Sequence, residues 1–124
     1  MNMNNAEHFR DAERSYMSSD WEDAVVGFKR VVHRDPNNLL ARLRIGLALT
    51  QQGKYEQAIE EYNEILKIDP DYSDAHYNLG WVYYHELQNI PEAIKHWQEL
   101  VRLKPEGIVG RRWLNEALAK QPAR

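Results

Sequence analysis

The sequence contains no cysteine among its 124 residues, which excludes disulfide bonds and a thiol nucleophile. Its 6 glycines are scattered rather than clustered, so they form no phosphate-binding loop. No apolar run is long enough for a signal peptide or a membrane-spanning helix. Neither sign of charge dominates, because 16 Lys and Arg residues oppose 19 Asp and Glu residues and leave a formal net charge of −3. We therefore expect a cytoplasmic protein that binds no nucleic acid and does not insert into membranes.

Metal sites and catalytic groups are also missing from the sequence pattern. The 5 histidines occur singly, without the second histidine or cysteine that would make a zinc site. The segment 69–74 superficially resembles a calcium-binding loop, but it lacks the glycine at the sixth position, and Gly80 stands where the acidic twelfth ligand belongs. The carboxylates of Glu60, Glu61 and Glu64 fit a solvated helix face. We expect no cofactor, no metal and no enzymatic activity.

Two helices are predicted within residues 39–70. Residues 41, 45, 48 and 49 repeat at the spacing of one helix face, and a second apolar row at 40, 43 and 47 lies on another face of the same helix. From Tyr55 to Ile68, apolar residues gather on one side and glutamates on the other. Gly53 separates the two helices, where a residue that tolerates positive φ is favoured, and Pro70 ends the second. A helix that is apolar on two faces either lies between neighbours or presents one face to a ligand.

This helix pair recurs along the chain. Each copy has an alanine, an aromatic residue four positions later and a proline eight positions after that: Ala24, Phe28 and Pro36; Ala58, Tyr62 and Pro70; Ala93, Trp97 and Pro105. The prolines lie 34 residues apart (70 − 36) and then 35 apart (105 − 70). The three alanines, with Gly46 and Gly80, should let facing helices approach closely while the aromatic rings fill the adjoining space. Such a period is typical of helical repeats.

The period, the small residues and the Ala-x-x-x-aromatic step resemble those of the tetratricopeptide repeat (TPR) family. The resemblance implies an all-α, right-handed α-solenoid of three helix-turn-helix repeats and a C-terminal capping helix, seven helices in all. The repeats are expected at about 5–38, 39–72 and 73–107, and the capping helix at about 108–120, within one domain spanning 1–124. Alternatively, the chain is cut from a longer array. In such arrays each repeat is stabilised mainly by its neighbours.

The first copy departs from the family pattern. Its first helix, expected from about Ala6 to Met17, carries Asp11 where leucine is usual and Ser15 where an aromatic residue is usual. Phe9 and Tyr16 either pack inward or line the inner surface, and the sequence leaves both possibilities open. Asp20 is expected to cap the next helix.

The third copy departs from the pattern at its corner. It has one residue more between its two helices, because 93 − 83 = 10 whereas 58 − 49 = 9. It also lacks the turn glycine, although Asn89 can cap the following helix and Pro91 is tolerated in the first turn of that helix. We therefore expect an intact third repeat with a locally different corner.

The resemblance implies a function in protein binding, because the first helix of each TPR pair lines a concave surface that contacts a peptide. By position, the expected partner-binding residues are Phe9, Tyr16, Leu43, Arg44, Leu47, Tyr77, Asn78, Trp81 and Tyr84. The aromatic residues at 77, 81 and 84 share one helix row, separate from the packing row. They either form a groove for a protein or peptide partner or are covered as core by the C-terminal helix. We favour the groove, because Tyr and Trp often dominate binding energies at interfaces.

One kind of TPR ligand is disfavoured. Chaperone-binding TPR domains hold a terminal carboxylate with lysines, asparagines and an arginine at set places, where this chain has Phe9, Glu13, Arg44, Asp74 and Asn78. The two acidic side chains would repel a carboxylate. We predict no binding to the acidic C-terminal tails of cytosolic chaperones.

Charge placement suggests a second function, as a self-assembling scaffold. Residues 1–23 carry 2 basic and 6 acidic side chains, a net of −4 (2 − 6), and residues 102–124 carry 6 basic and 2 acidic ones, a net of +4 (6 − 2). Opposite charges at the two ends could stack copies head to tail, a contact that forms rings or filaments. Solvated ends are the simpler interpretation, because exposed ion pairs are each worth under about 1 kcal/mol.

Overall fold

The structure is a computed structural model that describes residues 3–122. Over these residues the chain forms seven α-helices and one short π-helix, with no β-strand. The helices divide into two compact units, residues 1–68 (unit 1) and residues 69–124 (unit 2). The division falls between the second and third expected repeats. The single domain over 1–124 stays a prediction.

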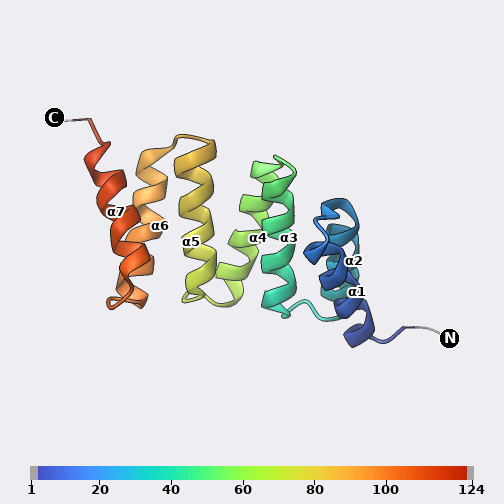
Figure 1. Cartoon of the computed structure of the whole chain (residues 1–124). Coiled ribbons are helices and arrows are strands. Elements are labelled where there is room, and N and C mark those ends of the chain that lie inside the picture. Colours follow the sequence, from blue (N-terminus) through green and yellow to red (C-terminus); the bar gives the residue numbers. More distant parts are fainter. Residues whose placement is uncertain (1–2, 123–124) are drawn as a thin grey trace. The chain divides into compact units, whose positions relative to one another are not determined.

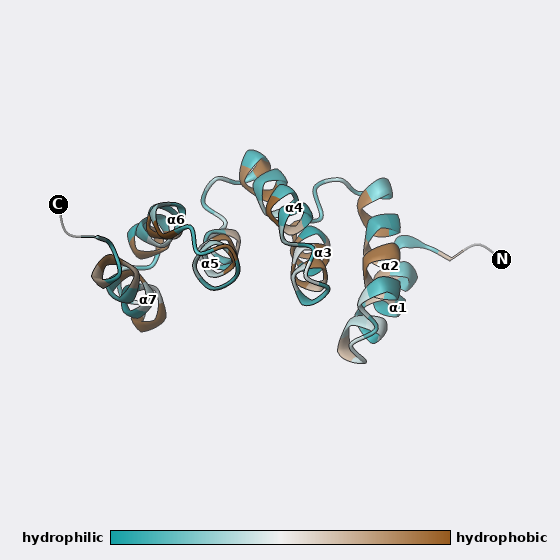
Figure 2. Ribbon diagram, turned by 90° about the horizontal axis from the view of Figure 1, so that it is seen from above, coloured by the Kyte–Doolittle hydropathy of each residue, from teal (hydrophilic) through white to brown (hydrophobic). Residues whose placement is uncertain are grey.

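Unit 1 contains two helix pairs. Helices α1 (Asn5–Met17) and α2 (Trp21–Arg34) pack together, as do α3 (Leu39–Gln51) and α4 (Tyr55–Ile68), and α3 also packs against α2 (Figure 1). In Figure 2, α2 and α4 each show apolar and polar sides, as expected of amphipathic helices. Residues on both faces of α3 are buried, which agrees with its two apolar rows.

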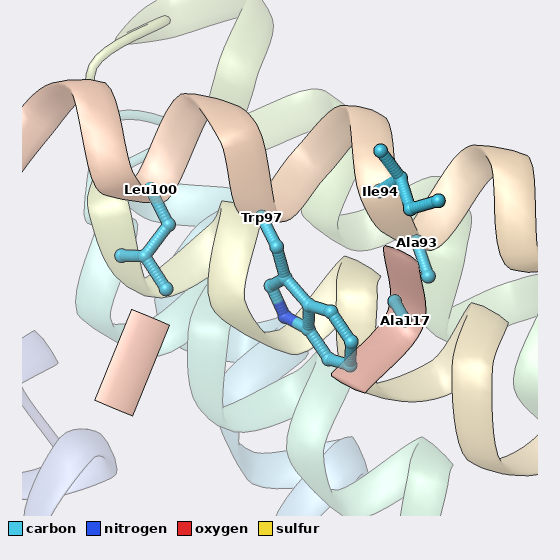
Figure 3. Close-up of a cluster of buried hydrophobic side chains, with 5 residues drawn as sticks. All are labelled: Ala93, Ile94, Trp97, Leu100 and Ala117. Carbon is cyan, nitrogen blue, oxygen red and sulfur yellow. The ribbon is translucent and has the colours of Figure 1, made fainter. Parts of the chain in front are cut away.

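Unit 2 contains one helix pair and a further helix. Helix α5 (Ser73–Trp81) continues into the π-helix η1 (Val82–Glu86) and packs against α6 (Ile90–Leu103). Helix α7 (Ile108–Ala119) packs against α6 close to the predicted position of the capping helix. Figure 3 shows a buried cluster of five side chains. Four of them, Ala93, Ile94, Trp97 and Leu100, come from α6, and Ala117 comes from α7.

The recurring small and aromatic residues are core residues, as predicted. Ala24, Ala58, Ala93 and their partners Phe28, Tyr62 and Trp97 all have 0% of their surface exposed. Gly46 and Gly80 let the facing helix of the pair come close to their backbone, and the part of that helix that comes closest is its aromatic ring. A Cβ on Gly46 would collide with the ring of Tyr62, and one on Gly80 would collide with the indole of Trp97. Each glycine therefore makes room for a ring.

Asparagine caps begin three of the helices. The Oδ1 atoms of Asn4, Asn38 and Asn89 accept backbone N–H bonds from Glu7 (2.9 Å), Ala41 (3.1 Å) and Glu92 (3.3 Å). The cap predicted at Asn89 is thus confirmed. Asp20 does precede α2, but its side chain makes no capping hydrogen bond, so that part of the prediction is wrong.

The corner of each helix pair contains one residue with positive φ at the same place in the repeat. These residues are Ser19 (φ 61°), Gly53 (φ 76°) and Gln88 (φ 55°). The extra residue of the third copy is accommodated just before this position, in the π-helix, where the N–H of Leu87 donates to the carbonyl of Val82 at 3.0 Å. The corner is locally different, as predicted, but the sequence did not predict that the difference would be a π-helix.

Candidate interaction surface

Two predicted site residues of α1 lie half-buried against rings of α2. Phe9 packs edge-on against Phe28 with the ring centres 5.4 Å apart, and Tyr16 packs edge-on against Trp21 at 5.3 Å. Each of the two side chains therefore both packs inward and keeps part of its surface exposed. The two possibilities left open by the sequence are not exclusive.

The arginine at the inner position of α3 is already partnered. The Nε of Arg44 donates to the Glu13 carboxylate at 2.8 Å, and the guanidinium lies over the Tyr16 ring, 5.0 Å from its centre. Its charge is thus balanced within unit 1. Of the two leucines predicted nearby, Leu47 is half-exposed, whereas Leu43 is buried and offers a partner little surface.

A hollow of about 400 Å³ lies beside Phe9 in unit 1. Its walls come from the first turns of α1 and the start of α3: Asn5, Ala6, Phe9, Arg10, Asn38 and Leu40. Leu40 is 42% exposed and contributes apolar surface to this hollow. The hollow can accommodate an apolar side chain, with polar groups at its rim.

In unit 2, the predicted aromatic row is joined by two rings that the sequence interpretation missed. Trp81 lies against His85, tilted by 30° with ring centres 3.8 Å apart, and meets Trp113 of α7 edge-on at 5.3 Å. Tyr84 lies 5.4 Å from the ring centre of Trp97, and Tyr77 lies 6.3 Å from that of Trp81. We refer to Tyr77, Trp81, Tyr84, His85 and Trp113 together as the aromatic surface.

The aromatic surface is partly covered. Helix α7 contributes Trp113 to it, and all five rings are half-buried rather than buried. This contrasts with Trp97, which is 0% exposed and whose indole N–H donates to the Tyr77 carbonyl at 3.2 Å. Trp113 could have been found from the sequence, because it stands one period (113 − 78 = 35) after Asn78, which is itself an inner position. Asn78 donates its amide to the Asp74 carbonyl at 2.8 Å.

Two of the five histidines come together, although the sequence shows no spacing that pairs them. His76 of α5 and His96 of α6 are both buried, and their Nδ1 atoms lie 3.2 Å apart. Among residues 3–122, however, no group of three or more His, Cys, Asp and Glu side chains is arranged to hold a metal ion. No helix in the same range is both long and apolar enough to cross a bilayer.

Comparison with known proteins identifies the fold. One family model, described as TPR repeat, matches residues 46–85, and another, described as tetratricopeptide repeat, matches residues 74–106. The first TPR of Spaghetti (RPAP3), solved bound to the HSP90 peptide SRMEEVD, superposes with a TM-score of 0.85 at 16% identity, covering 93% of this chain and 90% of that one. The TPR domain of Arabidopsis OM64 also gives 0.85 at 15% identity, covering 94% and 96%.

Relatives found by sequence match this chain over very different shares of their own length. Photosystem I assembly protein Ycf3 of Rippkaea orientalis is 22% identical over 124 residues, covering 86% of this chain and 72% of the relative. The peroxisomal targeting signal receptor of Saccharomyces cerevisiae is 30% identical over 65 residues, covering 52% of this chain and 11% of the receptor. The first four relatives are matched over 10–13% of their own length. The repeat matches and the superposed structures agree: the fold is an all-α TPR solenoid, and the chain belongs to the tetratricopeptide repeat family.

Proposed function

We propose that this protein is a non-enzymatic interaction module that binds a peptide or a segment of a partner protein through the first helices of its pairs. One related TPR domain was solved with a bound peptide, and a relative is named as a targeting-signal receptor. Binding by aromatic and aliphatic anchors fits the side chains that this chain presents at the corresponding places.

The aromatic surface is the observation that carries this proposal. Packing of the repeats uses Phe28, Tyr62 and Trp97, which are completely buried. Three rings of the aromatic surface, those of Tyr77, Tyr84 and Trp113, pack against the buried cluster of unit 2, but all five keep part of their area exposed. Partly exposed Tyr and Trp side chains bury much area with few rotors when a partner covers them, and each keeps a polar atom that can form hydrogen bonds.

The hollow beside Phe9 offers a second anchoring point, within unit 1. Its apolar walls suit one aliphatic or aromatic side chain of a ligand, and Arg10 and Asn38 at its rim supply polar contacts. The ligand that we expect therefore combines apolar or aromatic anchors with a few polar groups.

A ligand recognised by its terminal carboxylate fits less well. Arg44 is already bound to Glu13 at 2.8 Å, so it offers no unbalanced positive charge. Asp74, in the first turn of α5, adds a further negative charge. The same side chains that repel a carboxylate leave an apolar ligand unaffected.

Partner capture by the variant Leu47→Glu/Trp81→Ala tests the proposal. Quantitative mass spectrometry would compare the proteins captured by the wild type, by this variant and by a control, Val26→Glu/Ile68→Ala, which changes exposed apolar residues of α2 and α4. We expect the variant to lose partners that the control keeps, while both variants retain the helicity of the wild type and remain folded at the temperature of the assay. Retention of every partner by the Leu47→Glu/Trp81→Ala variant would contradict the proposal.

Self-assembly is a second candidate function, favoured by the surface of α7. Ile108 is 81% exposed and Val109 is 54% exposed, and they share this helix with Arg111 and Arg112. A basic, partly apolar surface complements the acidic segment 1–23 of another copy. Sedimentation at low and high salt tests this candidate: concentration-dependent association that salt weakens would support it, and a monomer under all conditions would exclude it.

A further inference from the structure

The pairing of α5 with α6 includes a buried link between two histidines. The Nδ1 atoms of His76 and His96 lie 3.2 Å apart, and the Nε2 of His76 lies 2.8 Å from the carbonyl oxygen of Pro70. Both residues are buried, with 7% and 8% of their surface exposed. The ring of Tyr83, from η1, stacks parallel to that of His96 with centres 5.9 Å apart.

These contacts fix where the protons lie when both rings are neutral. A carbonyl oxygen can only accept, so the Nε2 of His76 carries a hydrogen and its Nδ1 has a free lone pair. The Nδ1 of His96 must then carry a hydrogen and donate it to that lone pair. This leaves the Nε2 of His96 without a proton, 3.9 Å from the carboxylate of Glu92.

Unit 1 contains a different link at the same repeat positions. Arg42 lies one period before His76 (76 − 42 = 34), and Glu61 lies one period before His96 (96 − 61 = 35). The Nε of Arg42 donates to the Pro36 carbonyl at 2.8 Å, and its Nη1 lies 3.4 Å from the Glu61 carboxylate. Both repeats therefore tie the first helix to a proline carbonyl and to the second helix. Unit 1 does this with an ion pair, and unit 2 with two groups that can each take up a proton.

We propose that the His76–His96 pair makes unit 2 responsive to acid, because protonation of both rings sets two Nδ1–H groups against each other, which weakens the link between α5 and α6 and loosens the aromatic surface built on them. The first part of this inference stands on the geometry of the pair. The second part rests on the proposed function, since the aromatic surface matters only if it binds a partner.

The surroundings of His96 oppose its protonation. Burial is the largest cause and lowers the pKa of His96 to about 4, with further lowering by His76 and Lys95 and an opposite effect of Glu99. The Glu92 carboxylate, 3.9 Å from the Nε2 atom of His96, favours the charged form but does not outweigh burial, and the uncharged Tyr83 covers the ring face. Two protons on the pair would also set two Nδ1–H groups against each other at 3.2 Å.

The sign of the effect on stability follows from this shift. Because the pKa of His96 in the folded state lies below the ordinary histidine value of 6.5, the unfolded chain binds more protons between about pH 6.5 and pH 4. The stabilisation is therefore complete above pH 6.5 and is lost as the pH falls towards 4, by up to about tenfold in the unfolding equilibrium per pH unit. In unit 1, burial raises the pKa of Glu61, so Glu61 contributes no loss of stability over this range.

Nitrogen NMR of the histidine rings in the full-length wild type tests the pair directly. At pH 7 we expect hydrogen on the Nε2 of His76 and on the Nδ1 of His96, and titration of His96 well below pH 6. A proton on the Nε2 of His96 at pH 7, or titration of that ring near pH 6.5, would overturn the inference. This measurement needs no substitution, so it remains decisive if a variant fails to fold.

Tryptophan fluorescence measures the consequence for stability. With Trp21→Phe as background, Trp81, Trp97 and Trp113 all report on unit 2. Urea unfolding at pH 7, 6, 5 and 4.5 would compare this protein with His76→Arg/His96→Glu, which transfers the ion pair of unit 1, and with the control His33→Gln at an exposed histidine. We expect an acid-induced loss of about tenfold per pH unit in the background and the control, and a clearly smaller loss in His76→Arg/His96→Glu. Equal losses in all three would overturn the inference. Neither readout involves a partner, so failure of partner binding would leave this result standing.

Discussion

Single residues decide how closely the helices of a pair can pack. A methyl group on Gly46 would lie within 2.9 Å of several atoms of the buried Tyr62 ring. The ring cannot move into solvent, because it is fully buried and its hydroxyl lies 3.4 Å from the Thr50 hydroxyl. Burial also raises the pKa of Tyr62, which agrees with a ring held away from water.

We therefore expect Gly46→Ala to destabilise the protein by about 1–3 kcal/mol through overpacking, despite the better helix propensity of alanine. Urea unfolding would measure the change, with Gln57→Ala on the exposed side of α4 as the control, for which we expect a change within about 0.5 kcal/mol. A Gly46→Ala protein as stable as the wild type would show that the ring is not confined.

The role of a residue could be predicted from the sequence where the same type of residue recurs at the same place in all three repeats. The alanines and aromatic residues follow the period and are buried as expected. The burial of Leu43 and the missing cap bond of Asp20 were not predictable, because each depends on local packing or on a side-chain conformation that spacing does not encode. The contact of His76 with His96 also depends on how α5 lies against α6.

At the scale of the elements, the corner between paired helices requires one residue in the left-handed region. Glycine fills this place in the second repeat, whereas Ser19 and Gln88 fill it with φ values of 61° and 55°. A side chain in this region costs about 1 kcal/mol relative to glycine.

We expect Ser19→Gly and Gln88→Gly to stabilise the protein by about 0.5–1 kcal/mol each, and Gly53→Ala to destabilise it by a similar amount. Nothing lies within 4 Å of a Cβ placed on Gly53, so the loss would reflect backbone strain rather than a clash. Midpoints of urea unfolding would measure all three changes. Destabilisation by either glycine substitution would show that the corner does not follow this rule.

The π-helix shows the limit of prediction for an element. The one-residue difference between copies predicts a different corner, but an extra residue can enter either a loop or a helix. The structure places it in η1, where Val82 is buried and His85 reaches the Trp81 carbonyl at 3.3 Å. His85 lies on Trp81 four residues further along the helix, an ordinary helix spacing that the sequence interpretation overlooked.

For the whole molecule, the period is sufficient to predict the family, while ligand choice depends on side chains that do not follow it. The charges at these positions nevertheless disfavour one class of ligand, peptides that are held by a terminal carboxylate. We expect no saturable binding of the peptide SRMEEVD, which a related TPR domain binds, because Glu13 already neutralises Arg44 and Asp74 repels a carboxylate. Fluorescence anisotropy with the labelled peptide would measure this. Binding that is lost when the peptide's C-terminus is amidated would contradict the exclusion.

Site-specific photo-crosslinking tests the central claim, that a partner docks on the first helices of the pairs, most directly. A photoreactive phenylalanine analogue would replace Tyr84 in one protein and Val26, on α2, in another, and each would be irradiated with native partners. The account predicts a discrete crosslinked partner from position 84 and none from position 26. Crosslinks from position 26 without any from position 84 would contradict it.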